Sequence, residues 1–187
     1  MECTYPKCHA ISQYWLLDSR SLACKLTIFS RDLVERIKAG GDSTSCIAFR
    51  TFSWLRHAAR PLKVPELCEA ILIDASKSED RLSLEDLNTD IILSNIISNC
   101  KSSVIHEEAS GEIRFVHSTF KTFLEEQESS IFNQKLRPET YVEMSCTTYL
   151  GFVYFDKPCL DKELANTRAK DFAFCQYAAQ FWATHTK

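Results

Sequence analysis

The sequence has few residues that break regular structure, and it has no long apolar run. It contains 4 glycines and 5 prolines among 187 residues, so no long disordered linker is expected. No apolar run reaches the length of about 18 residues that a transmembrane helix needs. Lys7, His9, Asp18 and Arg20 interrupt the apolar patches near the N-terminus, which makes a poor secretory signal. We therefore expect a cytoplasmic protein that does not bind membranes.

The motifs of the common nucleotide-binding and hydrolytic sites are also missing. There is no G-x-x-x-x-G-K-[ST] phosphate loop, and no lysine after Gly40-Gly41 is placed to reach a phosphate. Neither G-x-G-x-x-G nor the nucleophile elbow G-x-S-x-G occurs. We therefore predict that the chain is not an enzyme and has no catalytic residues.

Charge of either sign is not in large excess. The chain has 22 Lys and Arg against 25 Asp and Glu, which gives a net charge of -3. A general binder of nucleic acid or of anionic membranes would show a basic excess. The length suits one ordinary domain plus an extension, and a hydrophobic content of 45% is typical of a globular protein.

Cysteine, in contrast, is frequent. The nine cysteines are odd in number and irregular in spacing, which favours reduced thiols that act mostly as small buried apolar residues. Cys3, Cys8 and His9 form a C-x4-C-H cluster. A closed zinc site needs four ligands, and no second pair follows nearby. We therefore predict no metal site.

Apolar periodicity predicts a series of helices in the first half of the chain. Ser30 is a suitable N-cap for a short helix, and Gly40-Gly41 ends it. The next helix stops before Pro61, because a residue that precedes proline is biased away from helix. Pro65 suits the first turn of the helix after that. The predicted helices cover residues 30–38, 46–59, a segment opened by Pro65, and a segment from Asn88 or Thr89 to about Asn99.

Two strands and a further helix follow. Residues 104–105 and 112–117 alternate in polarity around a turn at 109–111, which predicts a hairpin. Ser118 is expected to cap the next helix, in which Phe120, Phe123 and Leu124 repeat correctly. Three helices and then a hairpin is the order of a winged helix. We therefore predict a mainly α protein in which a winged-helix domain (three helices plus a β-hairpin) is followed by a helical extension.

The predicted organisation has three parts. Residues 1–29 show no period, residues 30–128 form the winged-helix domain, and residues 129–187 form a C-terminal helical segment. In that segment Pro138 opens a helix, Asp161 begins a charged connection, and the last helix carries an apolar stripe. Either this stripe packs on the preceding helix, or the natural protein continues and covers it. The stripe consists of Phe174, Tyr177, Ala178, Phe181, Trp182 and His185.

Winged helices often bind DNA, and the charges of the predicted recognition helix and wing indicate whether this one does. The predicted recognition helix carries Asp90 and has no Arg or Lys before Lys101. The predicted wing, HEEASGE, carries Glu107, Glu108 and Glu112. Contacts to phosphates and base edges need cationic and amide donors. We therefore expect a protein partner and no nucleic acid, with a free-standing winged-helix DNA-binding protein as the alternative.

Three segments resemble a known family. The runs FRTFSWLRHAARPLKVPELCEAI, GEIRFVHSTFKTFLE and FCQYAAQFWATH are similar to the region after the NACHT nucleotide-binding module in fungal STAND-class NTPases. These are NLR-like proteins that commonly continue into ankyrin repeats. The resemblance covers about residues 33–185 and is most specific at Ser53–Leu62 and Arg114–Phe120. It implies a winged helix that folds back over the nucleotide-binding core at rest.

The resemblance also implies a phosphate contact. In such proteins a histidine near the strand–helix junction contacts the phosphate of ADP, and His117 is the candidate by position, with Ser118 beside it. A protonatable imidazole at a helix N-terminus adds a donor where an anion already meets unpaired N–H groups. The better-known related pattern has an aspartate after the histidine, whereas Ser118 supplies no charge to orient the ring. Alternatively, His117 only ends the strand and bonds locally.

Cofactors and partners follow from the same resemblance. ADP or ATP is expected only together with a nucleotide-binding module, since this chain contains no phosphate loop. The implied partners are a NACHT module and repeat domains, in the same chain or supplied in trans. The implied role is that of a non-catalytic regulatory module in signalling.

Overall fold

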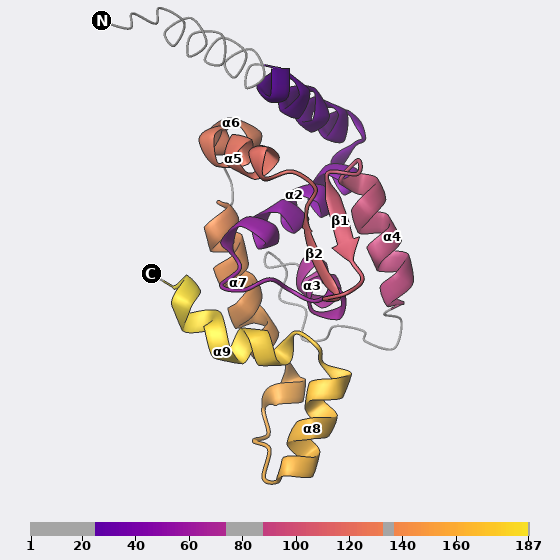
Figure 1. The fold of residues 1–187 in the computed structure, drawn as a ribbon. Coiled ribbons are helices and arrows are strands. Elements are labelled where there is room, and N and C mark those ends of the chain that lie inside the picture. The colour runs from indigo at the N-terminus through magenta and orange to yellow at the C-terminus, as the bar shows by residue number, and fades with distance from the viewer. Residues whose placement is uncertain (1–24, 74–87, 133–136, 187) are drawn as a thin grey trace, which may run out of the picture.

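The computed structural model describes residues 25–73, 88–132 and 137–186, and these ranges are mainly helical (Figure 1). A winged-helix body occupies the middle of the molecule, and the C-terminal helices lie along one side of it. The elements, in chain order, are a helix over residues 25–39, α2 (Asp42–His57), α3 (Val64–Leu72), α4 (Thr89–Asn99), β1 (Val104–Glu107), β2 (Glu112–Phe115), α5 (Ser118–Glu126), α6 (Glu128–Ile131), α7 (Pro138–Leu150), the 3-10 helix η2 (Val153–Phe155), α8 (Lys162–Asp171) and α9 (Cys175–His185).

The predicted order of three helices and a hairpin is confirmed. β1 and β2 pair antiparallel, with Val104 opposite Phe115 and Glu107 opposite Glu112. β2 ends at Phe115, two residues before the predicted end, although the Val116 N–H still donates to the Ser103 carbonyl at 3.0 Å. The fold class is therefore the mainly helical winged helix that the sequence pattern indicated.

A third segment joins the edge of this hairpin, and the sequence analysis did not predict it. Lys63, between α2 and α3, forms an antiparallel bridge with Glu112. The Val64 N–H donates to the Gly111 carbonyl at 2.9 Å. This pairing links the hairpin to the start of α3.

α2 covers residues 42–57 and not the predicted 46–59. Its N-cap is Gly41, at φ 91 and ψ 172, a conformation that glycine adopts far more readily than any other residue. The helix therefore starts at Asp42, whose carboxylate lies at the positive end of the helix dipole. It ends at His57 because Ala58 is already extended, at φ -59 and ψ 136, ahead of Pro61.

The helix over residues 25–39 does not begin at Ser30, so the predicted N-cap is wrong. Ser30 lies inside the helix and is buried. The predicted stripe of Leu33, Val34 and Ile37 is buried, and it extends back through Ser30 to half-buried Leu26 at the same helical spacing. The helix ends before Gly40, as predicted.

α3 and α4 begin where the sequence indicated. Pro65 lies in the first turn of α3, and the Glu66 carboxylate accepts from the Lys63 N–H at 2.9 Å. The Asn88 side chain caps α4 by accepting from the N–H groups of Asp90 and Ile91, both at 3.1 Å. Local capping rules therefore determined both N-termini.

Aromatic side chains fill the core on both sides of α2. Phe52 packs against Phe115 and Phe120, at centroid distances of 5.8 and 5.4 Å. Trp54 is fully buried and packs edge-on against Phe174 at 5.2 Å and Tyr177 at 5.8 Å. α2 therefore holds the hairpin through Phe52 and the C-terminal helices through Trp54.

The C-terminal segment is helical, as predicted. Its charged part forms a helix, α8, and is not only a connection between helices. Asp161 is the N-cap of α8, where its carboxylate accepts from the Leu164 N–H at 2.7 Å. α9 packs against α7, as the first alternative for its apolar stripe proposed. Tyr177 and Ala178 are fully buried, whereas Trp182 remains 45% exposed.

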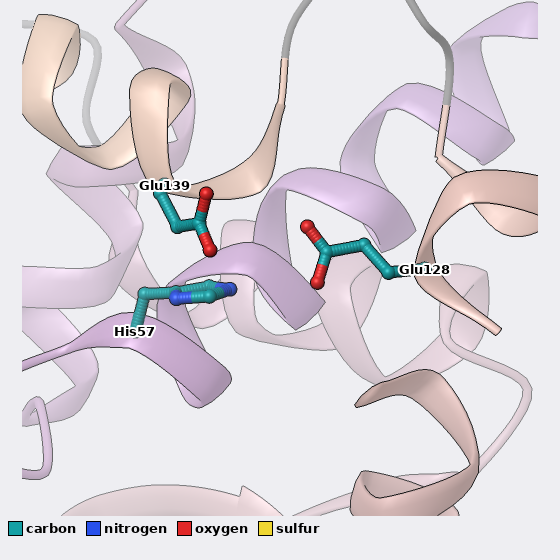
Figure 2. A group of neighbouring side chains, drawn as sticks. All are labelled: His57, Glu128 and Glu139. Atoms are coloured by element: carbon teal, nitrogen blue, oxygen red, sulfur yellow. The ribbon is translucent and has the colours of Figure 1, made fainter. Parts of the chain in front are cut away.

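Three helix ends meet on one side of the molecule. α2 ends at His57, α6 begins at Glu128, and α7 begins one residue before Glu139. Figure 2 shows the side chains of these three residues gathered in one space between the helices. Arg56, whose side chain is 4% exposed, forms an ion pair with Glu128 at 2.7 Å.

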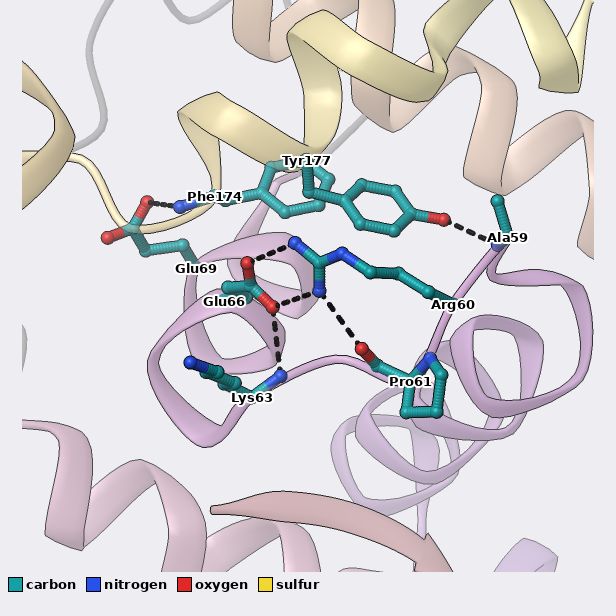
Figure 3. Close-up of polar contacts among 8 residues, drawn as sticks. All are labelled: Ala59, Arg60, Pro61, Lys63, Glu66, Glu69, Phe174 and Tyr177. Carbon is teal, nitrogen blue, oxygen red and sulfur yellow. Dashed lines mark hydrogen bonds and ion pairs between the residues drawn. The ribbon is translucent and has the colours of Figure 1, made fainter. Parts of the chain in front are cut away.

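A buried carboxylate joins α3 to the C-terminal helices (Figure 3). Glu69 accepts a hydrogen bond from the Tyr149 hydroxyl at 2.5 Å, and others from the N–H groups of Ala173 at 2.8 Å and Phe174 at 3.0 Å. The two N–H groups lie at the entrance to α9, where donors have no partner within the helix. Burial, and then the nearby Glu69 charge, raises the pKa of Tyr149, which therefore stays a hydroxyl donor.

Two neighbouring contacts extend the connection between α3 and the C-terminal helices. Arg60 binds Glu66 through two hydrogen bonds, at 2.6 and 2.8 Å, and stacks over the Tyr177 ring at 5.1 Å. The Tyr177 hydroxyl accepts from the Ala59 N–H at 2.8 Å (Figure 3). α3, α9 and the segment between α2 and α3 therefore form one continuous polar and aromatic contact, to which we refer as the Glu69 joint.

The six cysteines of the described residues are all free thiols, as predicted. Cys68, Cys100 and Cys146 are buried, and burial raises the pKa of each to about 12. Cys46 and Cys159 are exposed. The cluster of Cys3, Cys8 and His9 lies outside the described residues.

Within the same residues, no helix combines the length and the apolar character that a membrane crossing requires.

Gly41→Ala tests the start of α2. An alanine at φ 91 is strained, so we expect a loss of about 1–3 kcal/mol in the free energy of unfolding, measured by urea denaturation. Gly151→Ala is the matched control, because Gly151 has an ordinary φ of -81 and a Cβ there meets only normal contacts. An equal loss in both variants would contradict this account.

Glu69→Gln tests the joint between α3 and the C-terminal helices. Loss of the charged acceptor should lower the free energy of unfolding by about 1.5–3 kcal/mol. Tyr149→Phe should lower it by less, and the double variant should lose less than the sum, because both changes remove the same hydrogen bond. Glu163→Gln, on the exposed face of α8, is the control. Full additivity would show that Glu69 and Tyr149 are not coupled.

Candidate functional site

The junction between β2 and α5 is held by the aromatic core. Phe115 and Phe120 flank it, with their ring centroids 5.8 Å apart, and both pack on Phe52. His117 and Ser118 lie between these two anchors and are exposed. The core therefore sets the backbone path of the junction, and the two candidate residues stay accessible to a ligand.

The N-cap of α5 is His117 and not Ser118, which corrects the prediction. His117 is extended, at φ -129 and ψ 129, and its side chain makes no capping hydrogen bond. Its carbonyl accepts from the Phe120 N–H at 3.1 Å. Ser118 is the first helical residue, because the helical backbone begins as soon as β2 has released the chain. The first turn of α5 therefore has no side-chain cap.

His117 lines a small hollow of about 130 Å³ beside the helix over residues 25–39. Lys101 and Ser102, both at positive φ, form part of its wall, as do Phe29 and Leu33. Pockets for small molecules usually measure about 300–1,000 Å³. This hollow can take a single small group, such as one phosphate, but not a nucleotide.

Ser118 lines a different and larger hollow of about 590 Å³. It lies between the end of α2, the segment before α3, β2 and α5. The structure thus brings His117 and Ser118 to one junction but to different hollows. Four cationic side chains line the larger one, to which we refer as the basic groove: Arg56, Arg60, Arg114 and Lys121.

Most of the positive charge in the basic groove is already neutralised. Arg56 pairs with Glu128 at 2.7 Å, Arg60 with Glu66 at 2.6 Å, and Arg114 with Glu107 at 3.1 Å. The hydrogen bond to Glu66 raises the pKa of Arg60 above its usual value.

Two cations of the basic groove remain open to a ligand. Lys121 has no ion pair within the described residues and lies one turn after Ser118 on α5. The exposed Arg114–Glu107 pair contributes at most about 1 kcal/mol, so a ligand could displace it. The groove therefore offers Lys121, Arg114 and the open first turn of α5 to an anion.

The face on which a winged helix reads DNA is not basic here. α4 exposes Asp90, Ile91, Ser94 and Asn95 and contains no Lys or Arg. On the wing, Arg114 is paired to Glu107. The charge pattern expected from the sequence is thus present on the folded surface.

Sequence analysis found the junction but missed the residues around it. Arg60 and Glu69 carry no motif, since Arg60 stacks over the Tyr177 ring and Glu69 binds the Phe174 N–H, both of which lie in a distant part of the chain. Lys121 could have been found, because a spacing of three residues on a helix places it beside Ser118.

Comparison with known proteins supports the winged helix. The family model described as GPI inositol-deacylase, winged helix domain, matches residues 35–133, which is more than half of the chain. No curated protein matches the sequence significantly. No solved structure matches it either.

The matched range starts within the first described helix and ends after α6, so it contains α2–α4, the hairpin and α5. The chain belongs to the family of the winged helix domain of GPI inositol-deacylase.

Proposed function

We propose that this chain is a non-catalytic regulatory and interaction module. It acts as the winged-helix arm of a NACHT-type signalling NTPase and couples the nucleotide state of that module to adjacent repeat domains. The observation that carries the proposal is the Glu69 joint, which ties the winged helix to the C-terminal helices.

The joint supports a role in transmission. A buried carboxylate with three hydrogen bonds, and a fully buried Trp54 on the same interface, resist sliding between α3, α7 and α9. Packed interfaces of this kind shift between discrete arrangements and do not deform continuously. A displacement of the hairpin would therefore reach α9, the last described helix, as a movement of the whole body.

The β2–α5 junction supports a role in sensing. His117 and the first turn of α5 are exposed on a backbone held by Phe115 and Phe120. An ADP phosphate over this turn would meet free N–H groups and the His117 ring. ADP contacts would favour the closed arrangement, and exchange for ATP would release it.

The absence of catalytic motifs supports a non-catalytic role. The sequence has neither a phosphate loop nor a nucleophile elbow, so hydrolysis would belong to the nucleotide-binding module. Ser118 lines the other hollow, so its hydroxyl would have to turn toward His117 to add a hydrogen bond to the same phosphate.

His117→Ala tests the sensing contact in a protein that carries both this chain and a nucleotide-binding module. Loss of one hydrogen bond to a charged phosphate costs about 1.5–3 kcal/mol, so ADP should dissociate at least about tenfold faster. Stopped-flow release of a fluorescent ADP measures this rate, and basal activation should rise. His106→Ala, on β1, is the control.

Two outcomes count against the proposal. An unchanged ADP off-rate in the His117 variant removes this residue from the mechanism. If deletion of the whole winged helix also leaves ADP release unchanged, the regulatory role itself is contradicted.

The alternative function, duplex DNA binding, has a separate test. We expect a dissociation constant weaker than about 10⁻⁴ M at low salt, because α4 lacks cations and non-specific affinity comes mainly from phosphate neutralisation. Fluorescence anisotropy with a labelled random duplex measures it. A tighter affinity that falls steeply with added salt would favour the DNA-binding function and oppose ours.

A further inference from the structure

A histidine and two carboxylates from three separate helices meet beside the end of α2. One ligand atom each of His57, Glu128 and Glu139 lies within 4.8 Å of the other two. Figure 2 shows the edge of the imidazole directed into the space between the carboxylates. The residues are far apart in the sequence, and their types are those that hold zinc through nitrogen and oxygen.

The His57 ring has a nitrogen without a partner. Its Nε2 atom is buried and makes no hydrogen bond within the described residues. A buried polar atom without a partner is unfavourable, and such atoms in native proteins often face an ion or a water. Burial, followed by the charge of Arg56, lowers the pKa of His57. A neutral ring can offer a lone pair to a cation.

Arg56 orients one carboxylate of the cluster. Its Nη2 atom donates to Glu128 Oε2 at 2.7 Å, and its guanidinium lies over the Phe132 ring at 5.4 Å. This contact occupies one oxygen of Glu128 and leaves the other for a ligand. Outer contacts of this kind commonly fix metal-binding carboxylates. Arg56 also offsets the charge of one of the two carboxylates.

The spacing is close to that of a metal site. Zinc binds nitrogen and carboxylate oxygen at about 2.0–2.2 Å, so tetrahedral ligand atoms lie roughly 3.4 Å apart. The present spread of up to 4.8 Å must therefore shrink by a small side-chain movement. Glu139 is exposed at the start of α7, and its side chain can rotate toward the other two at little cost.

We propose that His57, Glu128 and Glu139 bind a divalent transition metal of the zinc type, with water in the fourth position. The metal joins the end of α2 and the start of α6 to the first turn of α7. It thereby clips the winged helix to the C-terminal segment on a face that the Glu69 joint does not cover. The proposal does not depend on the coupling to nucleotide.

The test is titration of the full-length chain with Co²⁺, and then with Zn²⁺ to displace it. The starting protein carries Cys3→Ser and Cys8→Ser, so that the N-terminal thiols cannot take the metal. We expect one Co²⁺ per chain, with the visible absorption of a tetrahedral ion and no thiolate-to-cobalt charge-transfer band. Bound Zn²⁺ should also raise the melting temperature.

Variants identify the ligands. Glu139→Gln should weaken Co²⁺ binding at least tenfold while leaving the fold intact, because Glu139 is exposed. His57→Asn should abolish it. Glu126→Gln, an exposed glutamate at the end of α5, removes the same charge nearby and should bind like the starting protein.

Three results would overturn the proposal. These are no stoichiometric binding by the starting protein, an affinity in Glu139→Gln equal to that in Glu126→Gln, or a charge-transfer band that places the metal on cysteine.

Discussion

The carboxylate of Glu69 is buried between two halves of the molecule, and it is satisfied entirely by the half to which it does not belong. Tyr149 and the N–H groups of Ala173 and Phe174 donate to it. A buried charge without such donors would be strongly unfavourable, so α3 and the entrance of α9 must stay together in the folded protein. The packing of Trp54 against Phe174 on the same interface adds an apolar contribution.

Direct packing connects the other features to this contact. α9 packs on α7 and α7 packs on α2, and the first turn of α7 lies next to His57. The hairpin is tied to the start of α3 through Lys63 and Glu112. The β2–α5 junction and the His57 cluster are therefore connected to each other through packed elements of the same structure.

Ion pairs within the molecule determine which charges on its surface remain available to a ligand. In the basic groove, three arginines are bound to carboxylates from other elements, and only Lys121 and the exposed Arg114 are open to competition. Chain composition conveys the overall balance of charge but not which cation meets which carboxylate, because each pair joins two different elements and Arg56 pairs with a carboxylate 72 residues away.

Local signals were enough for much of the fold. Apolar periodicity and the caps at Asn88 and Pro65 determined the helix order, and alternation determined the hairpin, because these depend on neighbours within a few residues. The start of the first helix was misplaced at Ser30, since a serine can also lie on a buried helical face. Only the tertiary structure decided the Glu69 joint, the separation of His117 from Ser118 and the meeting of His57 with two glutamates. Each depends on contacts between distant segments, which no local pattern of residues encodes.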